Sequence, residues 1–417
     1  MATTLPFVVC LLLITLASVR YRLPPFLTLV GAALLFGVLS GTSAEETVMA
    51  LTAGAGRIFA VLGIVIFAGV TIAQVLRESG RIERIVADLR RIVRRPLYAA
   101  GFAGYLLSVP LMCGITAFVI LSPIIAHLRS ERSVAALLLY TTAVGGTISY
   151  VLLYPSPVIQ TILATLALYP IDPWRIDLVT LPLSLLLLAG LFLLRRRSVP
   201  APETPAEAAL PAPAAGESLR AWLPVLVLFL MLGIGSAVPL LHALANINIA
   251  LLAALAAALI ATPAAVRDAA LARGTKNAGI IIFDLAGAGA FGGVIAASTF
   301  PSDIAALVAG ILPAMLLPFV IAALVQAAQG SRVVTAAVTA AILPTVPAAA
   351  VLHPAALVLM IAAGAFLVSY VSDPFFWLVK RTTGDGFGTV VRRYTLPLSG
   401  AGVVTLAAAL IVQMAWG

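Results

Sequence analysis

Apolar stretches of about 20 residues, the length of helix that spans a bilayer, recur from one end of the chain to the other. Short segments rich in Arg, Pro or Gly separate these stretches, so the sequence leaves no room for a large soluble domain. Of the 417 residues, 62% are hydrophobic and only 10% are charged, which lies far outside the range of soluble domains. The sequence therefore predicts an all-α, polytopic membrane protein with about ten transmembrane helices.

The net charge of +9 does not indicate a nucleic-acid partner. The positive residues lie in loops between apolar stretches and not on one amphipathic face, so we expect no nucleic-acid binding. Cys10 and Cys113 lie in apolar surroundings without metal-ligand spacing, and the three histidines are scattered at segment ends. We therefore expect a bilayer as the partner and neither a metal nor a bound cofactor.

The first half, residues 1–197, is expected to form one structural repeat. An apolar stretch in it is interrupted at Val109–Gly114, so each arm is too short to cross and a re-entrant hairpin is predicted. Arginines alternate with apolar residues at helical spacing between Arg77 and Arg95, which is typical of an amphipathic helix on the cytoplasmic surface. The expected elements are scaffold helices within 1–76 (spans 4–19, 24–41 and 48–76), the surface helix 77–95, the hairpin 97–127, a broken helix 133–170 and a helix 176–194.

The second half, residues 220–417, is expected to repeat this plan. Residues 198–219 are rich in Pro, Ala and Glu, a composition that cannot bury a core, and they are predicted to form a disordered cytoplasmic linker. The expected elements after the linker are scaffold helices within 222–297 (spans 222–242, 246–264 and 277–297), a re-entrant hairpin 304–347, a broken helix 354–380 and a helix 395–415.

The repeat is visible in the residues themselves. Ser149–Val151 recurs as Ser369–Val371, and Thr180–Ser184 recurs as Thr395–Ser399, in the same order. A chance pentapeptide is conceivable in so biased a composition, but several landmarks in one order favour a true repeat. The chain is thus predicted to contain two related halves.

The distribution of Lys and Arg predicts that the two halves are inverted. With Arg20 and Arg22 inside, all of the 25 Lys and Arg residues except Arg57, Arg175 and Arg332 fall on or beside the cytoplasmic side. No basic residue precedes the first apolar run, so this run is expected to be a span that starts outside and not a signal peptide. Both termini are then outside, and inverted repeats of this kind are typical of alternating-access carriers.

Interrupted helices in matching places of inverted repeats are the best sequence indication of a transport site. Four such places exist, the hairpin tips 109–116 and 329–335 and the breaks 145–157 and 369–374. Each of them alone could instead be a proline kink whose backbone groups are satisfied by neighbouring helices.

Arg332 is the most informative single residue, because a cation in an otherwise uncharged membrane segment is costly and needs a partner or a ligand. An anionic substrate is one candidate. Alternatively, the hairpin is shallow and Arg332 reaches water, or Arg332 pairs with Asp284 or Asp373.

Asp373 and Asp284 are candidate proton-coupling residues, since a carboxyl group inside a membrane protein is often a proton carrier. Asp373 follows Ser372 and precedes Pro374, so it could equally be the N-cap of the next helix. Asp284 lies in an apolar span and could instead be a buried structural partner.

Small polar residues at the four interruptions are candidates for hydrogen bonding to a carboxylate or hydroxyl group, although each alone could be a helix-packing residue. The candidate substrate-binding residues are Cys113, Gly114, Thr116, Thr147, Ser149, Ser156, Gln329, Gly330, Ser331, Arg332, Ser369 and Ser372. The Gly-rich run Ala286–Gly293 lacks the strand and Lys-Ser/Thr context of a nucleotide loop, and close helix packing is the better interpretation.

The sequence resembles the gluconate permeases, the GntP family of the ion transporter superfamily, over nearly its full length. The segments that carry the resemblance are Glu78–Gly80, Ala286–Gly293, Gln329–Thr335 and Val371–Lys380. The last of these is similar to the Asn-Asp-Ser-Gly-Phe-Trp segment of the family. The first hairpin tip departs from the family, which has a Phe-Phe-Asp type sequence where this chain has Pro110–Gly114.

The resemblance implies proton symport of a sugar acid or another small hydroxy acid, paired re-entrant hairpins, and a homodimer in which a scaffold supports a moving transport domain. A proton, or alternatively Na⁺, is then the coupling ion, and the location is the bacterial plasma (inner) membrane. A membrane-embedded enzyme is the main rival, but the sequence contains no plausible set of nucleophile, base or metal ligands. A passive channel is the second rival, and a carrier differs from it by saturation and proton coupling.

Overall fold

The computed structural model describes residues 3–21, 23–92, 95–126, 128, 131–166, 173–198, 215–300, 302–303, 306, 313–346, 349, 351–369 and 373–416. Within these residues the chain is helical and contains no strand, as the sequence predicts. Most of the predicted linker 198–219 lies outside the described residues. So do most of residues 304–312, where the second hairpin is expected to begin.

The helices of the first half follow the predicted order. They are α1 (Thr4–Val19), α2 (Pro25–Leu39), α3 (Ala44–Glu78), α4 (Arg81–Ile92), α5 (Pro96–Ser108), α6 (Gly114–Ala126), α7 (Arg132–Leu152), α8 (Pro157–Thr165) and α9 (Pro173–Arg195).

The second half shows a similar order of elements after α9, although α4 has no counterpart among its described helices. They are α10 (Ala215–Ala237), η2 (Pro239–Ala245), α11 (Ile247–Ile260), α12 (Ala264–Ala297), η3 (Ala314–Leu316), α14 (Leu317–Gln329), α15 (Arg332–Ile342), η4 (Leu343–Thr345), α17 (Pro354–Phe366), α18 (Pro374–Thr383), α19 (Phe387–Val390), η5 (Val391–Thr395) and α20 (Leu396–Trp416). The agreement in order is consistent with two repeats, whereas their inversion across a membrane stays a prediction.

Six helical segments in the described part of the chain are long and apolar enough to cross a membrane. They are Ala44–Glu78, Arg132–Thr165, Arg175–Arg195, Gly216–Gly235, Ala264–Ala297 and Phe387–Trp416. Shorter apolar helices, among them α2, α11 and α17, accompany them. The chain is thus a multi-pass membrane protein.

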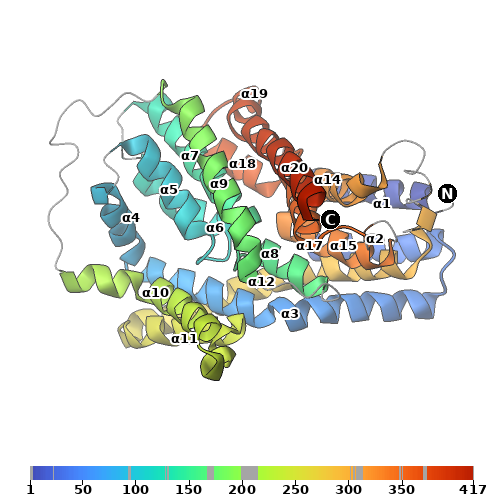
Figure 1. The fold of residues 1–417 in the computed structure, drawn as a ribbon, viewed down its shortest axis with the longest axis horizontal. Helices are drawn as coiled ribbons and strands as arrows, with labels where there is room; N and C mark the ends of the chain where they lie inside the picture. Colours follow the sequence, from blue (N-terminus) through green and yellow to red (C-terminus); the bar gives the residue numbers. More distant parts are fainter. Residues whose placement is uncertain are drawn as a thin grey trace.

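The long helices α3 and α12 run side by side and form one side of the molecule (Figure 1). Glycines allow their backbones to touch. A Cβ atom on Gly54 would lie 2.2 Å from the carbonyl oxygen of Gly289, and a Cβ atom on Gly293 would lie 2.6 Å from that of Ala50. The Gly-rich run Ala286–Gly293 therefore serves close helix packing, which confirms that interpretation of the sequence.

Helices α5, α7 and α9 pack on one another and stand at a steep angle to α3 and α12 (Figure 1). The expectation that Gly145–Gly146 breaks the helix is wrong, because α7 continues through both residues. A Cβ atom on Gly145 would lie 2.7 Å from the carbonyl oxygen of Gly101 on α5. These glycines bring α7 against α5, and the chain breaks only after Leu152.

Three helix boundaries differ from the predicted ones for local reasons. Helix α12 begins at Ala264, well before the predicted residue 277, because the charged segment between them is Ala-rich and contains no proline. Helix α17 ends at Phe366, earlier than predicted, and Val368 has a left-handed φ of 53°. The predicted surface helix 77–95 is divided, since Gly80 with φ of 67° ends α3 and α4 starts after it.

Helix α4 packs against α10 through a small polar cluster. Arg84 forms an ion pair with Asp88 at 3.2 Å, and the indole nitrogen of Trp222 donates to Asp88 at 3.2 Å. Ser218 donates to the same carboxylate at 3.0 Å. The polar face of this amphipathic helix thus meets the first turns of the second half.

A matched pair of glycine substitutions tests the close contact of α3 and α12. Gly54→Ala should destabilise the protein by about 1–3 kcal/mol, because its methyl group would collide with the backbone of Gly289. Gly56→Ala, on the same helix, meets nothing within 4 Å and should be neutral or slightly stabilising. Thermal unfolding of the detergent-purified variants measures both effects, and equal melting temperatures would contradict the assignment.

Candidate functional site

A cavity of about 800 Å³ lies where three interruptions between helices meet. The loop between α5 and α6, the loop between α14 and α15, and the break before α18 all contribute to its wall, together with α2, α3, α7 and α12. The predicted site residues that line it are Cys113, Gly114, Thr147, Asp284, Gly330, Ser331, Arg332 and Asp373. These predicted residues, which are up to about 260 positions apart in the sequence, thus line one cavity.

The loop between α14 and α15 is held in shape by its own polar groups. Gly330 adopts a left-handed conformation with φ of 78° and ends α14. The Gln326 side chain donates to the Gly330 carbonyl at 2.9 Å and accepts from the Thr335 hydroxyl at 2.8 Å. Ser331 is the N-cap of α15 and accepts from the Val334 N–H.

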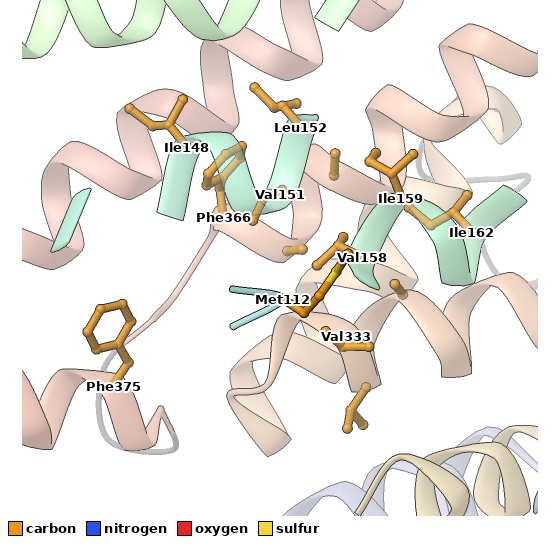
Figure 2. Packing of buried hydrophobic residues seen from close by; sticks show 14 of the residues in the cluster. Met112, Ile148, Val151, Leu152, Val158, Ile159, Ile162, Val333, Phe366 and Phe375 are labelled. Atoms are coloured by element: carbon orange, nitrogen blue, oxygen red, sulfur yellow. The ribbon is translucent and has the colours of Figure 1, made fainter. Parts of the chain in front are cut away.

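The loop between α5 and α6 inserts an apolar side chain between helices. Met112 is 1% exposed and lies in the buried cluster that also contains Val158 of α8 and Val333 of α15 (Figure 2). Gly69 on α3 leaves room for it, since a Cβ atom there would lie 2.1 Å from Met112 Cγ. Cys113 follows and accepts from the Thr116 N–H at 3.4 Å. This packing fixes the first loop against α3.

Arg332, at the start of α15, is 6% exposed and lies at the centre of a buried polar network. Its Nη2 donates to Asp373 Oδ2 at 3.1 Å, to Ser369 Oγ at 3.0 Å and to the Tyr394 hydroxyl at 3.1 Å. Its Nε has no hydrogen-bond partner among the described residues. One N–H donor of the guanidinium group is therefore not accepted by any described residue, which is unusual for a buried cation.

Asp373 has two structural roles at once. Its Oδ1 accepts from the Phe375 N–H at 2.8 Å and caps α18, whereas its Oδ2 pairs with Arg332 and accepts from the Tyr394 hydroxyl at 3.2 Å. Both structural alternatives considered from the sequence, the N-cap and the ion pair with Arg332, are thus confirmed. Neither excludes a functional role, because carboxylates that pair with intramembrane cations are frequent in proton relays.

Asp284 on α12 is not the partner of Arg332. Its Oδ1 accepts from the Phe26 N–H at 3.3 Å, close to the N-terminus of α2. A carboxylate at this position stabilises the positive end of the helix. Asp284 lines the same cavity as Arg332, on the wall formed by α2 and α12.

Five further candidate residues are described outside the cavity lining. Ser369 is fully buried and accepts from Arg332, so it belongs to the network. Ser149 donates to the Gly146 carbonyl, Ser156 caps α8, and Thr116 lies in the first turn of α6. Ser149 and Ser156 are helix residues with local bonds. Gln329 is the last residue of α14, and Ser372 lies outside the described residues.

Sequence reasoning missed Tyr394, which is fully buried and bonds to both Arg332 and Asp373. No local pattern marks it, because it lies in the first turns of the long last helix and reaches the site only through the fold. Tyr150, Trp377 and Arg381 also line the cavity without having been singled out. Tyr150 and Trp377 fall within segments that the repeat and the family resemblance do mark.

No group of three or more His, Cys, Asp or Glu residues in the described part of the chain could hold a metal ion. The arrangement supplies a buried cation with one donor unpaired among the described residues, two carboxylates and three aromatic side chains around a space of ligand size. Such a site is suited to binding an organic anion.

Comparison with known families decides the family of the chain. The model of the GntP family of permeases matches residues 2–169 and 227–415. The chain belongs to the GntP permease family. The two matched segments correspond to the two halves of the fold and leave out the region around the linker.

Relatives within the GntP family are described as permeases and transporters. The chain is 26% identical to an uncharacterized permease of Haemophilus influenzae, over 88% of this chain and 82% of that protein. It is 24% identical to the high-affinity gluconate transporter of Escherichia coli K12, over 97% of each chain. It is 26% identical to the D-serine transporter DsdX of Escherichia coli O6:H1, again over 97% of each chain.

Solved structures share the fold at low sequence identity. The YdaH transporter of Alcanivorax borkumensis superposes with a TM-score of 0.64 at 19% identity, covering 94% of this chain and 99% of that one. MtrF of Neisseria gonorrhoeae superposes with a TM-score of 0.61 at 15% identity, covering 95% and 96%. The GntP permease described here therefore has a transporter fold.

Substitution of Arg332 tests whether the ion pair with Asp373 is buried. Arg332→Met should destabilise the protein by about 3–5 kcal/mol, because Asp373 would be left as an uncompensated buried charge. The double variant Arg332→Met/Asp373→Asn should recover much of this loss. Arg273→Met, which removes an exposed ion pair with Glu78, is the control and should cost less than about 1 kcal/mol. Unfolding in SDS measures these values, and additive losses in the double variant would contradict a coupled pair.

Proposed function

We propose that the protein is a secondary active transporter that carries a small organic anion, of the sugar-acid or hydroxy-acid class, together with protons by alternating access. The observation that carries this proposal is Arg332, a cation that is 6% exposed, lines the cavity and has an Nε donor without a partner among the described residues. A cation is placed inside a membrane segment at high cost and is therefore a functional position. A carboxylate is the ligand that matches a guanidinium edge, because two parallel hydrogen bonds form.

Proton coupling is proposed to arise from competition for Arg332. A substrate carboxylate that pairs with Arg332 takes over the donor that now bonds to Asp373 Oδ2. Asp373 then loses its counter-ion in a site that is 1% exposed, where an uncompensated buried charge is costly. Substrate and proton would thus enter the site together, and Tyr394 would remain as a hydroxyl partner for both states.

The proposal includes a location and an orientation. We place the protein in the bacterial inner membrane, with both termini outside and the linker in the cytoplasm, on the basis of the Lys and Arg distribution. The family resemblance supports a homodimer whose helices α3 and α12 belong to the static part. Asp284, on α12, would then face the moving site from the static side.

A second candidate is a carrier of the same fold for a zwitterion such as an amino acid. The relationship to a D-serine transporter supports it, as does the presence of Asp284 in the same cavity as Arg332. An ammonium group on the substrate would need a carboxylate, and Asp284 is the one that is not paired with Arg332. Competition between serine and hydroxy acids for the site separates the two candidates.

The natural cysteines provide a direct test of the binding site. Cys113 lines the cavity, whereas Cys10 is fully buried, so a maleimide reagent should modify Cys113 alone. A bound hydroxy acid or sugar acid should slow this modification several-fold, because the ligand fills the space next to the thiol. The rate is measured by mass spectrometry of the purified protein. Cys113→Ser controls for modification elsewhere, and Arg332→Ala should abolish the protection. Modification at the same rate with every anion would contradict the proposed site.

Transport by Asp373→Asn tests the coupling role. Asparagine keeps the cap on α18 but cannot carry a proton, so uptake driven by a pH gradient should fall at least about tenfold while exchange of labelled for unlabelled substrate persists. Asp268→Asn, at a residue whose side chain is 79% exposed, is the control and should behave like the unaltered protein. The assay is run in proteoliposomes with and without Na⁺. Normal accumulation by Asp373→Asn would remove Asp373 from coupling, and dependence on Na⁺ alone would replace the proton as the coupling ion.

A further inference from the structure

We infer that the cavity is built for a carboxylate with an apolar or aromatic body, and that it disfavours the polyhydroxylated chain of a sugar acid. This inference rests on the proposed function, since it assigns the carboxylate of the substrate to Arg332. It uses the side chains around Arg332 to narrow the class of substrate. The first observation behind it is that most polar groups of the site are already bonded within the protein.

The polar groups near Arg332 leave few hydrogen bonds for hydroxyl groups. Both oxygens of Asp373 accept bonds, one from the Phe375 N–H and the other from Arg332 and Tyr394. The Thr147 hydroxyl donates to the Ala143 carbonyl at 2.9 Å. Ser331 is committed as the cap of α15. The donors and acceptors in this wall therefore complete one another instead of facing a ligand.

The polar groups that remain fit one charged end of a ligand. Among the described residues they are the Nε of Arg332, the exposed guanidinium of Arg381, the hydroxyl of Tyr150 and the carboxylate of Asp284, which already accepts one weak bond. A sugar acid has a hydroxyl on nearly every carbon, and each hydroxyl that leaves water needs a partner. The described lining can supply partners for a carboxylate and about two neighbouring hydroxyls. A longer row of hydroxyls would be left without partners.

The other walls of the cavity are apolar. Ile66 and Leu285 line it from α3 and α12, Met112 from the first loop, and Val334 from α15. Trp377, on α18, lines it with a side chain that is 41% exposed. The indole ring packs against the rings of Phe376 and Phe387, and its exposed part can add an apolar contact to a ligand. The aliphatic side chains exclude water from an apolar body.

The residues of the loop between α5 and α6 also favour an apolar ligand. Pro110–Gly114 contributes Met112, Cys113 and Gly114 to the cavity, and none of them has an amide or carboxylate group that could bind a hydroxyl. The Cys113 thiol is a small, weakly polar group that tolerates an apolar ligand.

A binding experiment with four ligands tests the inference on the full chain in lipid nanodiscs. The ligands are 3-phenyllactate, lactate, gluconate and the uncharged 3-phenyl-1,2-propanediol, measured by titration calorimetry. We expect 3-phenyllactate to bind at least about tenfold more tightly than gluconate or lactate, because a hydrophobic side chain is discriminated by roughly ten- to hundredfold in such pockets. The diol, which lacks the carboxylate, should bind at least about tenfold more weakly than 3-phenyllactate.

Two variants locate the effect. Trp377→Ala should weaken 3-phenyllactate at least about fivefold and leave lactate unchanged, because only the aromatic body meets this residue. Trp416→Ala, at an exposed tryptophan near the C-terminus, is the matched control and should change neither. Ile281→Ala, also in the cavity wall, should reduce the preference for 3-phenyllactate in the same direction if Trp377→Ala does not fold.

The outcomes separate this inference from the proposed function. If gluconate binds as tightly as 3-phenyllactate, or if Trp377→Ala weakens the binding of all anions equally, the inferred preference for an apolar body is wrong. The proposal that the protein carries an anion would still stand. A diol that binds as tightly as 3-phenyllactate, or no binding by any anion, would overturn the role of Arg332 and with it the proposed function.

Discussion

The helices that end inside this protein leave backbone N–H and C=O groups without helical partners, and the site depends on how these groups are satisfied. In a bilayer each unsatisfied group costs several kcal/mol, so irregular backbone is tolerated only where the protein supplies partners. Here Ser331 caps α15, Asp373 caps α18 and Ser156 caps α8. Gln326 bonds to the carbonyl of Gly330. These caps stabilise the helix ends that surround the cavity.

The residue that satisfies one of these helix ends is also the partner of the buried cation. Asp373 caps α18 through one oxygen and pairs with Arg332 through the other. A change in the group that is bonded to Arg332 therefore also affects the start of α18, because both interactions share one carboxylate. In the proposed transport cycle, this linkage would connect binding of an anion to a movement of the helix that lines the same cavity. Tyr394 ties the last helix into the same group.

Close packing of small residues defines the surface against which this site lies. Gly54 and Gly289 allow α3 and α12 to touch along their backbones, and a Cβ atom on Gly292 would lie 3.1 Å from Ala341 of α15. A surface of small residues is smooth, so a helix pair can move along it without large side chains having to exchange places. The arrangement is consistent with a static pair of helices and a mobile site, as the family resemblance implies.

The sequence by itself determined the membrane class, the order of the helices and the interruptions. It did so because spanning length, proline, glycine and basic residues act locally. It also marked Arg332 and Asp373, since a charge in an apolar segment is conspicuous wherever the chain folds. It could not decide that Gly145–Gly146 packs a continuous helix, because glycine breaks a helix or brings two helices together depending on the neighbour it meets.

Only the tertiary structure decided which residues meet. The pairing of Arg332 with Asp373, and not with Asp284, depends on the relative placement of α15, α18 and α12. Tyr394 joins the site because the last helix packs beside it, and no local pattern reveals a contact across 62 residues of sequence. The composition of the cavity wall also belongs to the fold. Side chains from distant helices set the polarity of a binding site, and their spatial sum is not written in any one segment.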